Sequence, residues 1–289
     1  MHRYSAIVLP VIFCVALLGG LYGFAQNGTS LSSSVETAFR NDEMLYAEVP
    51  AFAAEQSQSV STSSVTTFKL PILVYHIVRP SYPTDNAAVR SIAHTPEVFD
   101  AEMKYLGEAG YHVVSFTALE NYSRLGTPLP KKPITISFDD GWDDQFVYAF
   151  PILEKYNYTA TFFVFTNPID TKGFITWDEL RKMSRAGMTI GSHTRSHPYL
   201  TRITDPAKLW NEIDGSKKVL EDKLGITVKE FAYPFGLYDD AIMATVIKAG
   251  YLSARGDRYF RGNQMTSRLY ELDALNAPTT LELFSRMFP

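Results

Sequence analysis

The chain has 289 residues, of which 46% are hydrophobic, and a formal net charge of -4 at pH 7. Its 27 Lys and Arg residues are scattered without long runs, so electrostatics give no argument for a nucleic-acid partner. The length suits one large α/β barrel or two ordinary domains, and the single cysteine, Cys14, excludes a disulfide within the chain.

The N-terminal residues 1–25 combine the basic residue Arg3 with an almost entirely apolar run. This pattern predicts either a cleaved signal peptide or a membrane anchor, because the run approaches the roughly 20 residues that span a bilayer. Residues 26–68 are rich in Ser, Thr, Ala, Gln and Glu, which predicts a disordered linker. We therefore expect residues 69–289 to form a folded domain that is secreted or anchored outside the cytoplasm.

Strand-like and helix-like segments alternate through this predicted domain. The expected strands cover residues 70–76, 112–116, 133–138, 159–165, 188–192, 229–233 and about 251–254. The expected helices cover residues 95–109, 117–125, 143–156, 176–187, 206–224 and 239–249, and a Thr176–Glu179 capping box opens the fourth. So long an alternation favours a closed or nearly closed parallel α/β barrel, with functional side chains at the carboxyl ends of its strands.

Three of the expected strands end in acids or histidines, and two of them suggest a metal site, while the third ends at His76. Asp139 and Asp140 close the strand 133–138, and Gly141 supplies the turn that the two carboxylates need to share a pocket. His193 and His197 follow the strand 188–192 and are four residues apart, so a tight turn lets both imidazoles converge. One carboxylate and two imidazoles form a three-ligand metal site with open positions, and the second carboxylate is left for chemistry.

The motifs SFDDGW (137–142) and SHTRSHPYLT (192–201) resemble those of the polysaccharide deacetylase family, which are metal-dependent carbohydrate esterases. The resemblance covers about Leu70 to the C-terminus and implies a distorted (β/α)7 TIM-like barrel. It further implies that Asp139 is the general base and that Asp140, His193 and His197 hold the metal. Zinc is the expected ion, and cobalt, iron, manganese or nickel also suit such ligands.

Two further segments extend the resemblance. Residues 231–236, which include Tyr233, resemble the family's groove-wall motif, and the Phe235 amide would donate to the oxyanion. Ala232 stands where many relatives have an Arg that orients the base. Residues 70–78 resemble the opening strand of the poly-β-1,6-N-acetylglucosamine deacetylase subgroup, in which the catalytic acid comes from the N-terminal strand. The resemblance implies that His76 is that acid, and the alternative is that His76 is a structural histidine of the core.

The resemblance implies a hydrolase that removes N-acetyl groups from an N-acetylglucosamine-containing polysaccharide outside the cytoplasm and releases acetate. Trp142 and Tyr199 are candidate groove aromatics. We expect a monomer whose partners are the glycan and, if residues 1–25 are retained, the membrane. Two alternatives remain open: an O-acetyl polysaccharide esterase acting through the same site, and a non-catalytic tethered glycan-binding module.

Overall fold

The computed structural model describes residues 66–256 and 263–289. The predicted signal or anchor, residues 1–25, and the predicted linker up to residue 65 lie outside the described residues. The end of that linker differs from expectation, because Thr67 and Phe68 belong to β1 (Thr67–Lys69), which pairs antiparallel with β11 (Asn263–Met265). Within the described ranges, no helix combines the length and apolarity needed to cross a membrane.

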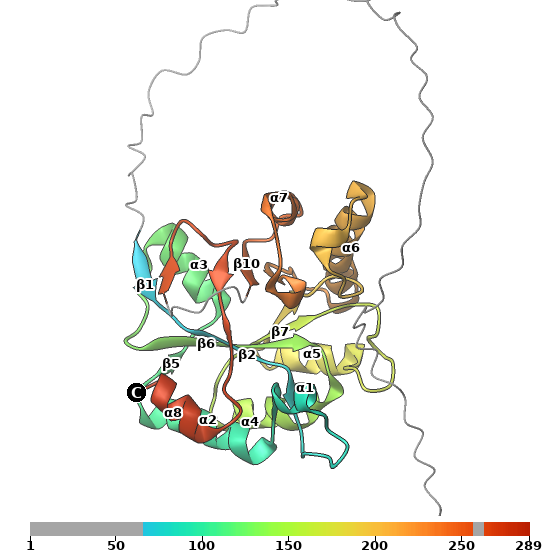
Figure 1. Ribbon diagram of the computed structural model, residues 1–289. Coiled ribbons are helices and arrows are strands. Elements are labelled where there is room, and N and C mark those ends of the chain that lie inside the picture. Colours follow the sequence, from blue (N-terminus) through green and yellow to red (C-terminus); the bar gives the residue numbers. More distant parts are fainter. Residues whose placement is uncertain (1–65, 257–262) are drawn as a thin grey trace, which may run out of the picture. The chain divides into compact units, whose positions relative to one another are not determined.

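A parallel sheet forms the centre of the fold (Figure 1), and its hydrogen-bonded path runs β12-β10-β9-β8-β7-β6-β2-β13. The strands on this path are β2 (Ile72–Tyr75), β6 (Pro133–Asp140), β7 (Thr161–Val164), β8 (Thr189–Ser192), β9 (Glu230–Ala232), β10 (Ser253–Gly256), β12 (Leu272–Asp273) and β13 (Leu275–Asn276). Only Ala274 separates β12, which pairs with β10, from β13, which pairs with β2. One segment therefore nearly closes the sheet into the predicted barrel.

Helices cover the outside of this barrel. They are α1 (Ala87–Arg90), α2 (Pro96–Glu108), α3 (Phe116–Leu125), α4 (Phe150–Lys155), α5 (Trp177–Arg185), α6 (Pro206–Leu224), α7 (Asp240–Lys248) and α8 (Leu281–Met287). In Figure 1, α2, α4 and α8 gather on one side of the sheet, where the Tyr105 hydroxyl donates to Phe288 O. Short strands β3 (Ile77–Val78) and β4 (Ala93–His94) pair with each other, and β5 (His112–Val113) pairs with the start of β6.

Strand β6 shows how the side chains divide between barrel and helices. Ile134, Ile136 and Phe138 belong to the large apolar core packed under the helices. The alternate residues of an extended strand face the other way, which turns Thr135, Ser137 and Asp139 toward the barrel interior. The buried Ser137 hydroxyl is satisfied there, because it donates to Leu73 O.

The helix expected over residues 143–156 is interrupted. Residues Gln145–Ala149 form a π-helical turn, and α-helical geometry resumes only at Phe150. Pro151 provides the physical reason, because it lacks an N–H and its ring clashes with the carbonyl four residues earlier in a regular α-helix. The wider π turn relieves that conflict and directs the buried side chain of Gln145 toward the strand ends.

Candidate metal and catalytic site

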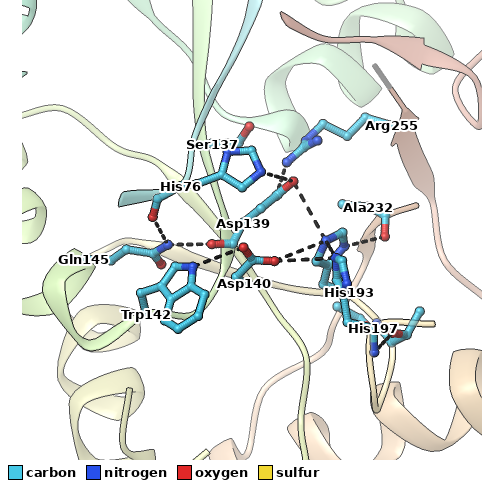
Figure 2. Close-up of polar contacts among 12 residues, drawn as sticks. His76, Ser137, Asp139, Asp140, Trp142, Gln145, His193, His197, Ala232 and Arg255 are labelled. Carbon is cyan, nitrogen blue, oxygen red and sulfur yellow. Dashed lines mark hydrogen bonds and ion pairs between the residues drawn. The ribbon is translucent and has the colours of Figure 1, made fainter. Parts of the chain in front are cut away.

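The expected site residues converge at the carboxyl ends of three barrel strands (Figure 2). Asp139 and Asp140 end β6, His193 directly follows β8, and His76 directly follows β2. These strands run parallel in the order β2-β6-β7-β8, so their carboxyl ends lie at one rim of the barrel. The topology therefore brings together residues that lie more than a hundred positions apart in the sequence.

Asp139 and Asp140 share the site because the backbone turns between them. Asp140 itself adopts a left-handed conformation with φ of 75°, and Gly141 follows with φ of 76°. The sequence placed this break at Gly141 alone, whereas it begins one residue earlier. A Cβ on Gly141 would lie 2.9 Å from Val164 Cγ1, so the close packing of β7 also favours glycine there.

Asp140, His193 and His197 form the predicted three-ligand cluster. One ligand atom from each lies within 4.8 Å of the others. Asp140 Oδ1 is 3.5 Å from His197 Nε2 and 3.9 Å from His193 Nε2, and the two Nε2 atoms are 3.1 Å apart. The turn that returns His197 to the site uses left-handed conformations at Thr194 and His197, and Thr194 Oγ1 accepts from His197 N at 3.0 Å.

The protonation of these imidazoles fits a bound cation. His193 Nδ1 lies 2.8 Å from Ala232 O, a carbonyl that can only accept, so Nδ1 donates this bond and Nε2 is the nitrogen directed at the cluster. Burial and the neighbouring His193 lower the pKa of His197 to about 4, which keeps that ring neutral at pH 7. Two imidazoles and a carboxylate form a donor set suited to a divalent transition metal ion.

Trp142 contributes to this cluster in a way that its sequence position did not indicate. The indole Nε1 donates to Asp140 Oδ2 at 3.1 Å, the oxygen opposite the one nearest the histidines. The indole ring also stacks on Phe174 at a centroid distance of 4.7 Å. Trp142 therefore orients the ligand carboxylate, and one of its ring faces is already covered.

Asp139 is buried beside the cluster, and its main charged partner, Arg255, was missed by the sequence analysis. The Arg255 guanidinium contacts Asp139 Oδ1, while Oδ2 lies 3.9 Å from His193 Nε2 and 4.0 Å from His76 Nε2. Burial alone would raise the pKa of Asp139, but Arg255, His193 and His76 outweigh it, so the pKa lies below its ordinary value. The carboxylate is thus ionised, with one oxygen held and the other directed at the cluster.

Arg255 contacts Asp139 although residue 232, where the resemblance implies an arginine that orients the base, is alanine. Ala232 on β9 pairs in register with Arg255 on β10, so the guanidinium enters at the same level of the barrel from the neighbouring strand. The Arg255 guanidinium carbon also lies 4.7 Å from the centre of the Phe163 ring. A signal was available in the sequence, since Arg255 is a charged residue directly after the expected strand 251–254, which is the kind of position that the other site residues occupy.

The expected groove residues divide into exposed and buried ones. Phe235 has a left-handed backbone with φ of 59°, is 43% exposed, and contacts the His197 ring. Tyr199 stacks on Phe235 at 3.9 Å and is covered on its other face by Arg202, so it supports Phe235 instead of presenting a free face. Tyr233 is a correction: its side chain is buried and its hydroxyl donates to Tyr270 O, which places it in the core.

Residues 126–254 match the sequence profile of the polysaccharide deacetylase family. The chain is similar to this family over that segment. It is 31% identical to the Bacillus subtilis (strain 168) protein YxkH over 187 residues, which are 63% of this chain and 62% of that relative's length. It is 25% identical over 199 residues to the poly-β-1,6-N-acetyl-D-glucosamine N-deacetylase of Staphylococcus aureus (strain MRSA252), covering 62% of this chain and 68% of that relative.

A solved deacetylase structure shares the fold of this chain. The Streptococcus pyogenes deacetylase PplD in complex with acetate superposes with a TM-score of 0.70 and 25% identity, and the match covers 78% of this chain and 100% of that chain. The predicted distorted (β/α)7 barrel is thereby confirmed.

Proposed function

We propose that this chain is a metal-dependent hydrolase that removes N-acetyl groups from an N-acetylglucosamine-containing polysaccharide outside the cytoplasm and releases acetate. The observation that carries the proposal is the ionised carboxylate of Asp139 beside the Asp140, His193 and His197 cluster. The match of residues 126–254 to the family and the names of the S. aureus and S. pyogenes relatives support the choice of reaction. Poly-β-1,6-N-acetylglucosamine is the leading substrate by similarity to the S. aureus enzyme.

Asp140, His193 and His197 would hold the metal ion, with zinc as the expected species and cobalt, iron, manganese or nickel as others that suit these ligands. A divalent ion bound there supplies Lewis-acid polarisation, which an acetamide requires because it is a poor electrophile. The protein prepares the ligands through two hydrogen bonds, from His193 Nδ1 to Ala232 O and from Trp142 Nε1 to Asp140 Oδ2.

Asp139 would act as the general base and His76 as the general acid. Asp139 Oδ2 faces the cluster, so it would take a proton from the water that attacks the acetyl carbonyl carbon, while Arg255 holds Oδ1. His76 Nε2 lies 4.0 Å from that same oxygen and is partly exposed, so it can protonate the departing amine as the C–N bond breaks. The products are acetate and a glucosamine unit.

The main-chain amide of Phe235 would stabilise the oxyanion that develops on the acetyl group. Its left-handed backbone and its contact with His197 place this residue beside the cluster, and a backbone N–H is a suitable oxyanion donor. Trp142 and Phe235 would form the walls that contact sugar rings, with Tyr199 stacked behind Phe235. Residues 1–25 would direct the chain to the extracytoplasmic side as a signal or anchor, and we expect a monomer.

The test is acetate release by the full chain from N-acetylated glucosamine oligomers in the presence of added divalent metals. We expect one acetate for each free amine formed, and a loss of about 100-fold or more for Asp139→Asn. Activity restricted to O-acetylated sugars would replace the amidase with the esterase alternative. Glycan binding without acetate release under any metal would indicate the non-catalytic module.

A further inference from the structure

Gln145 is a fully buried residue that contacts both catalytic candidates through their main chains. Its side-chain Nε2 donates to His76 O at 2.8 Å and to Asp139 O at 2.5 Å (Figure 2). Both partners are carbonyl oxygens, which can only accept, so the amide must present its NH2 group to them and each hydrogen has one acceptor. A single side chain therefore joins the ends of two strands.

The bridge occurs where regular pairing between those strands stops. The last paired residues of β2 and β6 are Tyr75 and Phe138. Beyond them the chain from β2 continues into β3, which pairs with β4 instead. The His76 and Asp139 carbonyls thus lie past the end of the β2–β6 ladder, and the Gln145 amide takes the place of the missing strand contact.

The residue before Gln145 holds the same stretch of chain from a second point. Asp144 Oδ1 accepts from Val78 N at 3.1 Å, and this carboxyl is also buried. Asp144 and Gln145 therefore bind main-chain groups on either side of Ile77, which fixes the direction in which the chain leaves His76. The π-helical turn at Gln145–Ala149 places these two residues under the strand ends.

We propose that Gln145 is a positioning residue that sets the separation between the general base Asp139 and the general acid His76. The role rests on the proposed function, in which Asp139 takes a proton from the attacking water and His76 gives one to the departing amine. Asp139 Oδ2 and His76 Nε2 are 4.0 Å apart and belong to the ends of two different strands, so their spacing depends on how the strand ends are held. A displacement of about 1 Å in such a pair can lower the rate about 100-fold.

Gln145→Met removes both hydrogen bonds at nearly constant volume, and Gln264→Met is the matched control. Gln264 is also buried, and its Nε2 donates to Leu70 O at 3.1 Å and to Asp273 O at 2.8 Å. None of these groups belongs to the catalytic site. Both variants should lose thermal stability. Any loss of kcat that comes only from this destabilisation should therefore appear in both of them.

The measurements are kcat and KM for acetate release and the Kd for Zn²⁺, all on the full chain. We expect Gln145→Met to lower kcat about 10- to 100-fold, with KM and the Zn²⁺ Kd within about twofold of wild type, because neither sugar walls nor metal ligands contact Gln145. Gln264→Met should keep the wild-type kcat. An equal kcat loss in both variants, or none in Gln145→Met, would overturn the proposal.

A shorter amide provides the test if Gln145→Met does not fold. Gln145→Asn keeps one amide group but is too short to reach both carbonyls, so we expect an intermediate loss of kcat with an unchanged Zn²⁺ Kd. A wild-type kcat in Gln145→Asn would contradict the role of Gln145. A wild-type chain that releases no acetate would instead overturn the proposed function, and with it this role.

Discussion

Replacement of Trp142 by phenylalanine tests whether the protein prepares Asp140 for metal binding. The substitution removes the indole N–H that donates to Asp140 Oδ2 at 3.1 Å. It retains an aromatic ring that can stack on Phe174, as the indole does at 4.7 Å. The main expected consequence is a carboxylate that is free to rotate away from His193 and His197.

The magnitude follows from the chemistry of the lost bond. A hydrogen bond to a charged group contributes about 1.5–3 kcal/mol, and loss of an outer-shell partner of a metal ligand weakens metal binding about 10- to 100-fold. These ranges agree, since each factor of ten corresponds to about 1.4 kcal/mol. Trp142 and Asp140 are both partly solvent-exposed, so we expect a loss of about 10- to 30-fold in Zn²⁺ affinity, near the lower end.

The assay is calorimetric titration of the metal-free full chain with Zn²⁺. Trp210→Phe is the control, because Trp210 lies on α6 and its ring faces Lys248, away from the metal ligands. We expect Trp210→Phe to keep the wild-type Kd. Equal Zn²⁺ affinities for Trp142→Phe and Trp210→Phe would refute the reasoning that the indole orients Asp140.

Three further substitutions test the surroundings of the site and the core. Arg255→Met leaves the buried Asp139 carboxylate without its partner, so it should destabilise the fold by about 3–5 kcal/mol, raise the pKa of Asp139 and lower kcat. Arg255→Lys should recover part of the lost kcat, and a wild-type kcat in Arg255→Met would contradict the reasoning. Burial raises the pKa of Glu102 to about 8, so wild-type stability should fall as pH rises from about 4.5 through 8. The Tm of Glu102→Gln relative to wild type should therefore increase over that range, and Tm curves that stay parallel would contradict the raised pKa. Gly191→Ala would put a Cβ 2.5 Å from the Phe163 ring and should cost about 1–3 kcal/mol in a denaturant titration, so an unchanged midpoint would show that the ring can move.

Glu102 also shows why a short distance does not establish an ion pair. Its Oε1 lies 3.7 Å from His94 Nε2, and its Oε2 accepts from the Tyr75 hydroxyl at 3.0 Å. Burial raises the pKa of Glu102 and lowers the pKa of His94 to about 4, so both groups are neutral at pH 7. The contact is therefore between neutral groups. It packs β4 against α2 next to Tyr75, the residue that precedes His76.

Elements with strong local signals were predicted with the right bounds. Helix α6 covers residues 206–224 as expected, because Asp205 caps its first turn, Pro206 begins it, and Gly225 ends it in a left-handed conformation. The capping box at Thr176 and Glu179 is likewise confirmed. In these segments the residues that start and stop the helix lie within it or next to it, so one sequence suffices.

Elements that depend on distant partners were not predicted. The segment that closes the barrel, residues 272–276, consists of two strands of two residues each, which is too short for a periodic pattern. Its conformation is set by β10 on one side and β2 on the other. The π-helical turn before Pro151 is a different case, because Pro151 lies in the interior of the expected helix 143–156, where proline disfavours α-helical geometry, and this local signal was missed.

The residues of the candidate site also divide into those that a local sequence pattern marks and those that only distant contacts define. Asp139, Asp140, His193 and His76 were found because each closes or follows an apolar strand, and parallel strands bring their ends together. Arg255 and Gln145 were missed because their roles depend on contacts across 116 and 69 residues of sequence. Nothing near either residue in the sequence marks which strand end it will reach.

The most direct test of the account combines metal removal with acetate release by the full chain. The chain is stripped of metal, assayed on N-acetylated glucosamine oligomers, and then titrated with Zn²⁺ or Co²⁺ while acetate is measured. We predict no release from the stripped chain, recovery that saturates at about one ion per chain, and no recovery in His193→Ala. Full activity of the stripped chain, or equal recovery in His193→Ala, would contradict the claim that Asp140, His193 and His197 hold the ion that the reaction requires.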